Sequence, residues 1–363
     1  MRLVRTATLL AGTLLAACAT GNKKPAETPK DQVIQTLSAH VAKGEILYGH
    51  QDDLCYGHAW KVEDWETDSL TRSDVKAVTG KYPAIMGFEL GGIEMGDKAS
   101  LDSVDFNLIR KAVLTHAGRG GIVTISWHPR NPLTGGDAWD ISSDQAVASV
   151  LPGGEKYELF QQWLDRLADW ILSLKAEDGS QIPVLFRPWH EHSGSWFWWG
   201  RDLCTDEEYN ALWRMTWDHL VRERGIEGLL WAISPNYMDR DFEQWESRYP
   251  GDAYVDVVGL DCYASMDRAR YLRQMHAGLG SLQRFCEEHG KILAVTETGL
   301  ETLPDSLWWT GTLSEAIQGF PVSYVLTWRN ASDKPTHFYA PYAGQASAED
   351  FAAWITQDHI TVL

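Results

Sequence analysis

The sequence predicts a single (β/α)8 TIM barrel, a fold of the α/β class in which eight parallel strands alternate with helices. From about residue 31 to the end, short apolar runs alternate with amphipathic runs. Such alternation is typical of βα units, whose successive strands pair in parallel. The expected strands are residues 46–49, 84–88, 121–127, 183–186, 229–233, 255–260, 291–296 and 322–327. Nearly all of them end in polar or aromatic residues, and barrel enzymes place their active sites at that end of the strands.

The helices expected between these strands have apolar residues spaced three and four positions apart. The clearest such stripe covers residues 159–174. Thr205 and Glu208 have the spacing of a capping box, so a helix is expected to begin there. Gly290 is expected to end a later helix, and Ser347 is expected to cap the last one.

Composition narrows the function before any motif is considered. The chain has 363 residues, a net charge of −18 and 18 tryptophans. The negative charge argues against a nucleic-acid partner, because a basic surface is expected for that purpose. Indole rings stack on flat apolar faces such as those of sugar rings, so carbohydrate is a candidate ligand. The alternative is that the tryptophans only fill a large core.

The N-terminus has the pattern of a lipoprotein export signal. Residues 1–17 are expected to be a signal peptide, because a positive start precedes an apolar stretch too short to span a membrane. This stretch ends in Leu-Ala-Ala before Cys18, which resembles a bacterial lipobox and predicts lipidation of Cys18; ordinary secretory cleavage is the alternative. Residues 18–30 are expected to be a flexible tether and 31–363 the barrel domain. Because Ala19 rather than Asp follows the cysteine, we expect an outer-membrane anchor, on the periplasmic side or at the cell surface.

The remaining cysteines do not predict a metal site. Their spacing matches no zinc pattern, so we expect buried free thiols, although one pair could oxidise in an exported protein. These cysteines are Cys55, Cys204, Cys262 and Cys286. His190 and His192 flank Glu191, but zinc-binding histidines of this kind lie a turn apart on a helix, and this stretch is not helical. No metal and no cofactor are expected.

Two glutamates at strand ends are the strongest chemical signal. Glu191 follows the fourth expected strand and Glu297 follows the seventh. In a barrel, these strand ends converge on one face, and hydrolysis of a glycosidic bond needs two carboxyl groups there. A separation of about 5 Å would predict retention of configuration at the anomeric carbon. The alternative for Glu297 is a structural ion pair with a nearby arginine.

The motifs around these glutamates resemble those of glycoside hydrolase family 26 β-mannanases. The matching stretches are GHQDD at 49–53, SWHP at 126–129, RPWHEHSGSWFWWG at 187–200, LDCY at 260–263, TETG at 296–299 and TWRN at 327–330. The resemblance implies a retaining barrel enzyme in which Glu191 is the acid/base and Glu297 is the nucleophile. It also implies that Tyr263 hydrogen-bonds the nucleophile.

The resemblance further implies a set of sugar-binding residues. His128 would contact the sugar at the cleavage point, and His190 would steer the substrate or tune the acid beside it. Trp196 would form an aromatic wall. Trp328 would be the platform under the reacting sugar, and Arg329 would reach the next sugar on the non-reducing side. Trp139 lies in a long loop and is a weaker candidate for a distal subsite.

The expected substrate is β-1,4-mannan, glucomannan or galactomannan, or the manno-oligosaccharides derived from them. A β-glucanase or xylanase on the same scaffold is one alternative, and a non-catalytic glycan-binding lipoprotein is another, of a different class. The chain is expected to act as a monomer that contacts a membrane only through its lipid.

Overall fold

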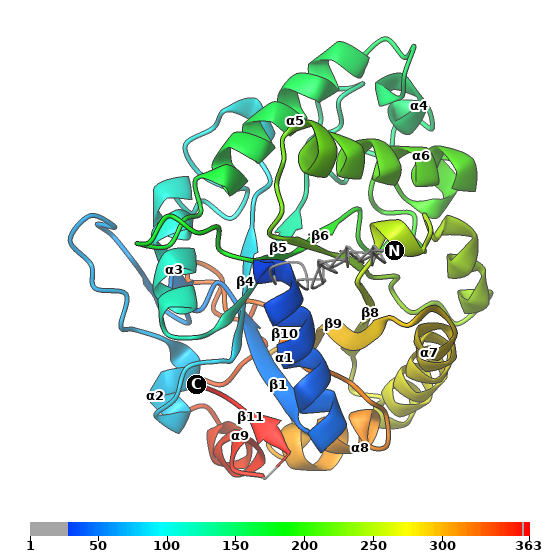
Figure 1. The fold of residues 1–363 in the computed structure, drawn as a ribbon. Coiled ribbons are helices and arrows are strands. Elements are labelled where there is room, and N and C mark those ends of the chain that lie inside the picture. The colour runs from blue at the N-terminus through cyan, green and yellow to red at the C-terminus, as the bar shows by residue number, and fades with distance from the viewer. Residues whose placement is uncertain (1–27, 358) are drawn as a thin grey trace, which may run out of the picture.

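The computed structural model describes residues 28–357 and 359–363. Residues 1–17, Cys18 and most of the expected tether lie outside this part of the chain, so the predictions made for them stay predictions. The described residues form a parallel barrel surrounded by helices (Figure 1). In the described part of the chain, no helix combines the length and the apolar character needed to cross a membrane.

The predicted (β/α)8 barrel is confirmed by the strand order. The strands pair in parallel in the order β1, β4, β5, β6, β7, β8, β9, β10, and β10 pairs with β1 to close the sheet. Their bounds are β1 Ile46–Gln51, β4 Ile85–Glu89, β5 Ile122–Trp127, β6 Val184–Pro188, β7 Leu229–Ile233, β8 Val257–Ala264, β9 Ile292–Leu300 and β10 Tyr324–Thr327. The short β11 (Ile360–Thr361) adds to the start of β1, and β2 (Tyr56–Gly57) with β3 (Trp60–Lys61) forms a separate hairpin.

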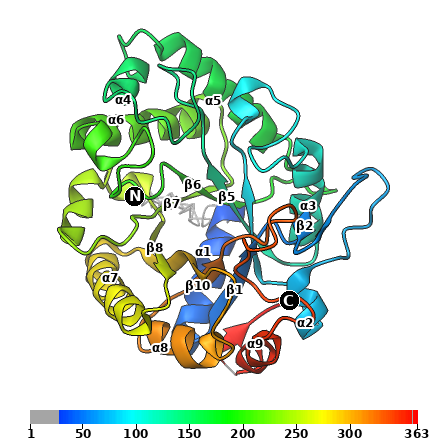
Figure 2. The same ribbon diagram turned by 180° about the vertical axis from the view of Figure 1, so that it is seen from behind.

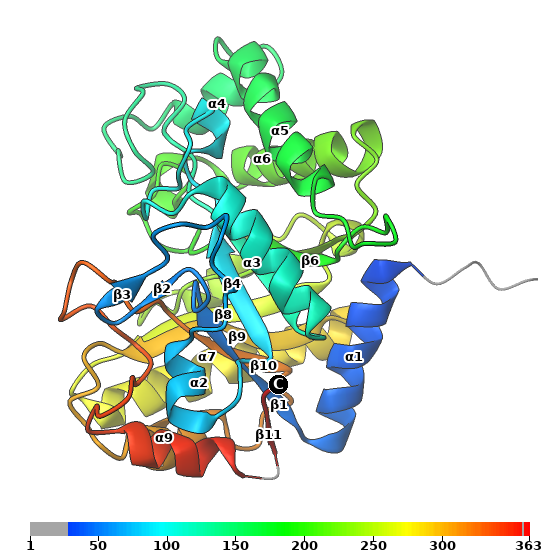
Figure 3. The same cartoon turned by 90° about the vertical axis from the view of Figure 1, so that its left-hand side faces the viewer.

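Helices surround the barrel, as the views from the front and from behind show (Figures 1 and 2). The α-helices are α1 Pro29–Lys43, α2 Asp74–Thr79, α3 Phe106–Gly118, α4 Ala146–Val150, α5 Tyr157–Leu172, α6 Asp206–Trp217, α7 Arg268–His289, α8 Ser314–Ile317 and α9 Ala348–Ile355. Short 3-10 turns are η1 Ile93–Met95, η2 Arg201–Leu203, η4 Phe242–Arg248 and η5 Asp252–Tyr254, and the π-helical turns are η3 Asp218–Glu223 and η6 Trp308–Leu313. The β2–β3 arm lies toward the barrel end opposite α1 (Figure 3).

The apolar core is divided by the barrel wall. Side chains from the strands fill the barrel interior, and Val33 and Leu37 of α1 join this inner cluster and close its N-terminal end. A larger cluster fills the space between the strands and the outer helices. Because both faces of the strands are buried, they are apolar along most of their length. The polar chemistry is therefore concentrated at the strand ends.

Two of the predicted helix ends are confirmed by the structure, and two others differ from the prediction. Thr205 forms the full capping box with Glu208, and Gly290 ends α7 in the left-handed conformation at φ 63°. Ser347 occupies the N-cap position of α9 but does not cap it, because its hydroxyl bonds Gln345 Oε1 at 2.7 Å instead. Residues 29–30 were expected in the tether, but they begin α1 because Thr28 and Asp31 form a capping box there.

The cysteines of the described chain are free thiols, as predicted. Cys55, Cys262 and Cys286 are buried and Cys204 is partly buried. Burial raises the pKa of each thiol, so all four stay protonated at neutral pH.

Candidate active site

The loop that carries Glu191 begins with a strained turn at the end of β6. Pro188 is the last residue of the strand, and both Trp189 and Glu191 have a φ of 53°. Left-handed backbone in residues other than glycine is uncommon and is concentrated at functional sites. The Glu191 backbone N–H donates to the Ser234 carbonyl at 2.7 Å, which ties this turn to the end of β7.

Glu191 and Glu297 meet at the C-terminal end of the barrel, as the sequence predicted. Glu297 lies within β9, where the pairing with β8 shifts register beside Asp261. One carboxylate oxygen each from Glu191, Asp261 and Glu297 lies within 4.8 Å of the other two. This spacing matches the separation of about 5 Å between the carboxyl groups of retaining glycosidases and leaves too little room for the water of an inverting enzyme.

Arg187 neutralises two of these carboxylates. Its guanidinium forms ion pairs with Asp261, at 2.9 Å, and with Glu297. Asp261 also accepts hydrogen bonds from Ser234 at 3.1 Å and from Thr296 at 2.5 Å. A cluster of three carboxylates could hold a cation, but here the buried guanidinium already supplies positive charge to the cluster.

Tyr263 holds the second oxygen of Glu297. Its hydroxyl donates to Glu297 Oε2 at 2.6 Å, as the resemblance implied. Burial, together with the adjacent Glu297 charge, raises the pKa of Tyr263 well above its usual value. The phenol therefore stays protonated and remains a donor. Glu297 thus has one oxygen on Arg187 and the other on Tyr263, which fixes its orientation.

Glu191 has a different environment. Burial raises the pKa of Glu191 well above its usual value, and the nearby Glu297 and Asp261 charges raise it further. The Trp196 indole N–H donates to Glu191 Oε2 at 2.7 Å and orients the carboxyl group. One carboxyl group that keeps its proton beside another that is held by a cation and a phenol is an arrangement suited to acid and nucleophile roles.

His128 and His190 form a buried pair beside these carboxylates. Their Nε2 atoms lie 2.9 Å apart, and His128 Nδ1 lies 2.7 Å from Glu89 Oε2. Burial lowers the pKa of His128, but the Glu89 charge and hydrogen bond outweigh it, so the net pKa is raised. Burial, with the Arg187 and His128 charges, lowers the pKa of His190 well below its usual value. Two ring nitrogens 2.9 Å apart can share one proton in a hydrogen bond, with one ring as donor and the other as acceptor.

A cavity of about 390 Å³ extends from His128 toward the ends of β10 and β4. Trp139, Trp328 and Arg329 are among the residues that line it. The Trp139 ring stacks on His128 with centroids 5.3 Å apart, and 46% of Trp139 is exposed. Arg329 forms an ion pair with Asp102 at 3.0 Å. The predicted residues His128, Trp139, Trp328 and Arg329 thus share one cavity, with flat aromatic faces suited to sugar rings.

Other aromatic and histidine residues near the site belong to the core. Trp198, Trp199 and His192 are fully buried, and His192 packs on the Tyr209 ring at 4.8 Å. His50 is buried next to Asp53, with His50 Nδ1 3.0 Å from the carboxylate.

Three residues of the site were not assigned a role from sequence: Glu89, Arg187 and Asp261. Each lies at or near a strand end, and Arg187 and Asp261 also lie within motifs of the resemblance. Their positions near strand ends were the signal that could have singled them out.

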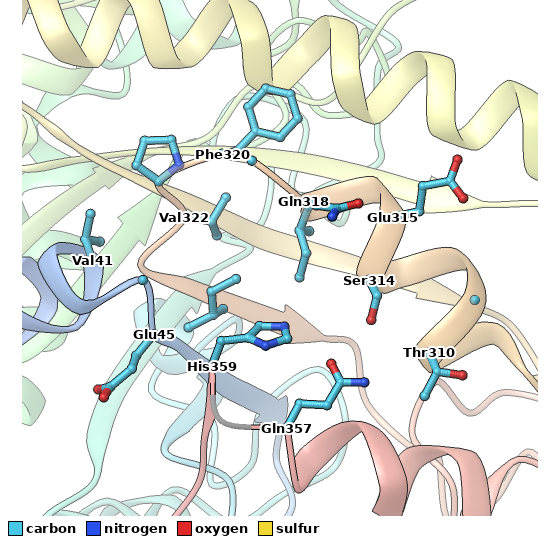
Figure 4. Close-up of a pocket in the computed structure, with 16 residues that line it drawn as sticks. Val41, Glu45, Thr310, Ser314, Glu315, Gln318, Phe320, Val322, Gln357 and His359 are labelled. Atoms are coloured by element: carbon cyan, nitrogen blue, oxygen red, sulfur yellow. The ribbon is translucent and has the colours of Figure 1, made fainter.

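A larger hollow, of about 840 Å³, lies at the other end of the barrel (Figure 4). It is lined by residues that precede β1, β10 and β11. Its two glutamates, Glu45 and Glu315, lie on opposite sides of the hollow. Because no pair of carboxyl groups converges among its described residues, the site at the C-terminal strand ends is the better candidate.

A parallel barrel with two converging carboxyl groups at its C-terminal end defines a class, the retaining glycoside hydrolases built on this fold. Residues 24–309 match the family model described as glycosyl hydrolase family 26. The chain belongs to this family.

Known relatives agree with this assignment. The structure is similar to that of a GH26 β-mannanase from Bacteroides ovatus, with a TM-score of 0.88 and 47% identity over 92% of this chain and 94% of that chain. The catalytic domain of an endo-β-1,4-mannanase from Bacillus sp. JAMB-750 gives a TM-score of 0.82 and 31% identity, over 93% of each chain. A mannan endo-1,4-beta-mannosidase from Bifidobacterium adolescentis is 34% identical over 83% of this chain. The match spans only 32% of that relative's length, and 55% of the length of a Bacillus subtilis relative.

Proposed function

We propose that this protein is a retaining β-1,4-mannanase that cleaves mannan, glucomannan or galactomannan. The observation that carries the proposal is the convergence of Glu191 and Glu297 at a separation suited to double displacement. The names of the curated relatives and of the structural neighbours support mannan as the substrate.

In the first step, the Glu297 carboxylate attacks the anomeric carbon and the glycosidic bond breaks. Glu191 gives its proton to the departing oxygen, which leaves as the hydroxyl of the released sugar chain. Arg187 and Tyr263 orient Glu297 for the attack. Trp328 and His128, which line the adjacent cavity, are proposed to hold the reacting sugar, and Arg329 the next one.

In the second step, Glu191 is a carboxylate and takes a proton from water. The resulting hydroxide attacks the anomeric carbon, the bond to Glu297 breaks, and the sugar leaves with its original configuration. Glu191 is again protonated and Glu297 is again a carboxylate, so the catalytic cycle closes without a metal or a cofactor.

Azide rescue tests the two roles. In Glu191→Ala, a substrate with an activated aryl leaving group should still form the glycosyl-enzyme and then stall, because no base activates water. Azide needs no base, so it should restore turnover and give a β-glycosyl azide. An α-azide from this variant would reverse the two roles, and near wild-type activity on mannan in both Glu191→Ala and Glu297→Ala would refute the mechanism.

Reducing-sugar release from mannan, lichenan and xylan separates the alternative functions. We expect release from mannan; release only from lichenan or xylan would indicate a β-glucanase or a xylanase. Binding without release from any of them would indicate a glycan-binding protein.

We also propose that the protein is exported and held at a bacterial membrane by a lipid on Cys18, with the barrel acting as a monomer. The lipobox-like residues before Cys18 support this proposal. Cys18→Ser should move the protein from the membrane fraction to the soluble fraction without loss of specific activity. Unchanged membrane retention would refute the anchor.

A further inference from the structure

The loop after β10 carries two of the proposed sugar-binding residues, Trp328 and Arg329. It runs from residue 328 to residue 347 and contains no helix or strand. Three further residues of this loop line the same cavity as Trp328 and Arg329, namely Asp333, Lys334 and His337. A loop of this length depends on side-chain contacts to keep one conformation, because it has no regular backbone ladder of its own.

Asn330 joins the two ends of the part of this loop that spans residues 330–340. Its side chain is 1% exposed, and its amide nitrogen donates to Asp74 Oδ2 at 2.9 Å and to the Ala340 carbonyl at 3.0 Å. Its amide oxygen accepts from the backbone N–H groups of Tyr339, at 2.9 Å, and of Ala340, at 3.0 Å. A primary amide has two donors and one oxygen with two lone pairs, so every hydrogen-bonding position of Asn330 is occupied.

Asp74 connects Asn330 to the opposite side of the loop. This buried carboxylate also accepts from the Trp60 indole N–H at 2.7 Å and from the His58 backbone N–H at 2.6 Å, both on the β2–β3 hairpin. The Asp74 backbone N–H donates to Asp53, which follows β1, at 3.0 Å. Hydrogen bonds to an ionised acceptor are stronger than neutral ones, so this carboxylate is a firm anchor for the loop.

The same amide acts toward the proposed nucleophile as well. Tyr339, whose backbone N–H bonds Asn330, packs its ring on Tyr263 with centroids 5.4 Å apart. Tyr263 in turn donates to Glu297. Asn330 thus lies directly beside Arg329 in the chain on one side, and on the other it fixes the residue that packs against the phenol holding Glu297.

We propose that Asn330 is a positioning residue, which holds Trp328 and Arg329 in place for the sugar through its amide bonds to Asp74 and Ala340. This inference rests on the proposed function. Asn330 is buried and acts through its neighbours, so its role is to place the groups that meet the substrate. Only a side chain with both donors and acceptors fits here, because Asp74 and the Ala340 carbonyl need donors and two backbone N–H groups need an acceptor.

Asn330→Asp tests this role, because it keeps the shape of the side chain and replaces the amide donors with a carboxylate. Two carboxylates in direct contact repel one another, so the loop should move away from Asp74. We expect KM for mannotetraose to rise by about fivefold or more, since a displaced Trp328 and Arg329 bind the sugars less tightly. The matched control is Asn210→Asp on α6, which also removes an amide donor from a backbone carbonyl, that of Ser247 at 2.9 Å; it should leave KM unchanged.

Thermal melting of Asn330→Asp accompanies the kinetics, so that both constants are measured well below the melting temperature. A lower kcat with an unchanged KM would mean that the substitution only reduces the amount of active enzyme, and would overturn the inference. Unchanged values of both constants would overturn it as well. A wild-type protein that does not cleave mannotetraose would overturn the proposed function itself, before any variant is compared.

A milder variant decides the question if Asn330→Asp does not fold. Asp74→Asn leaves Asn330 intact and weakens its acceptor without adding a like charge. We expect KM for mannotetraose to rise by about threefold or more in this variant, because a hydrogen bond to a neutral acceptor is weaker than one to a carboxylate. An unchanged KM, or the absence of folded protein in both variants, would mean that the pair supports the fold as a whole and would overturn the positioning role.

Discussion

Tyr263 contacts Glu297 through a single hydroxyl, which makes its role separable from packing. Tyr263→Phe removes the 2.6 Å hydrogen bond to Glu297 and keeps the ring, whose contact with Tyr339 has centroids 5.4 Å apart. We expect kcat/KM on mannan to fall more than tenfold, which corresponds to about 1.4 kcal/mol of transition-state stabilisation.

Thermal unfolding of the same variant is the control for the Tyr263 prediction. The melting temperature should change little, because no apolar contact is lost. A variant with full activity and a large loss of stability would place Tyr263 in the core instead of the catalytic site.

At the residue scale, the sequence indicated the reacting groups better than the groups that support them. Glu191 follows β6, and Glu297 was expected just after a strand of residues 291–296, so their positions alone predicted convergence. The strand in fact continues to Leu300, so Glu297 lies within β9. Arg187 lies one residue before the end of β6, but a pattern of strand ends does not reveal that its side chain pairs with Asp261 on β8 and Glu297 on β9. Glu89 was visible as a strand end, but its pairing with His128 depends on the register between β4 and β5.

At the element scale, one buried arginine holds the loop after β6. Arg248 is fully buried on η4, and its guanidinium donates to the carbonyls of His192, Trp199, Arg201 and Cys204 and to the Asp206 carboxylate. These acceptors lie in the segment that also carries Trp196, so the arginine fixes the shape of the loop around Glu191.

Arg248→Ala should therefore destabilise the protein strongly. Loss of the guanidinium leaves several carbonyls and the Asp206 carboxylate without their partner. We expect the free energy of unfolding to fall by about 3–5 kcal/mol, measured by urea denaturation. The control is Arg222→Ala, which removes an exposed pair with Asp218 at 2.8 Å and should cost less than about 1 kcal/mol. Similar losses in the two variants would contradict the bracing role of Arg248.

Element ends show where sequence patterns stop being informative. The capping box at Thr205 is a local signal and was confirmed, since both partners lie within one turn. Ser347 has the same residue type, but a competing acceptor on Gln345 takes its hydroxyl. Helix α1, which closes the N-terminal end of the barrel, was not assigned from sequence, because most of its residues are polar and only Val33 and Leu37 are buried.

At the scale of the whole molecule, the barrel gathers buried and partly buried carboxyl groups whose like charges oppose one another. Most of the protein's negative charge lies on the surface in water, but Glu191 lies beside Asp261 and Glu297 at the barrel end. Burial and the charges of Glu297 and Asp261 raise the pKa of the Glu191 carboxyl group well above its usual value, because this site does not favour a third negative charge.

This arrangement predicts how stability depends on pH. Below the ordinary glutamate pKa of about 4.3, Glu191 is protonated in both the folded and the unfolded states and has no effect on the balance. As the pH rises toward its raised folded pKa, the unfolded state loses this proton first. The Glu191 contribution to the free energy of unfolding therefore falls with rising pH and levels off above the folded pKa.

Glu191→Gln removes this titration, so the variant should gain stability over the wild type as the pH rises. We expect the difference in free energy of unfolding, variant minus wild type, to increase by more than about 1 kcal/mol between pH 4 and pH 7. Urea denaturation at both pH values measures it, with Glu177→Gln, an exposed glutamate, as the control that should give no such increase. If the difference stays constant with pH, Glu191 titrates alike in the two states. A Glu191 carboxyl group with an ordinary pKa would already be ionised at neutral pH. It could not then supply the proton that the first step of catalysis requires, so the acid role proposed for Glu191 would fail.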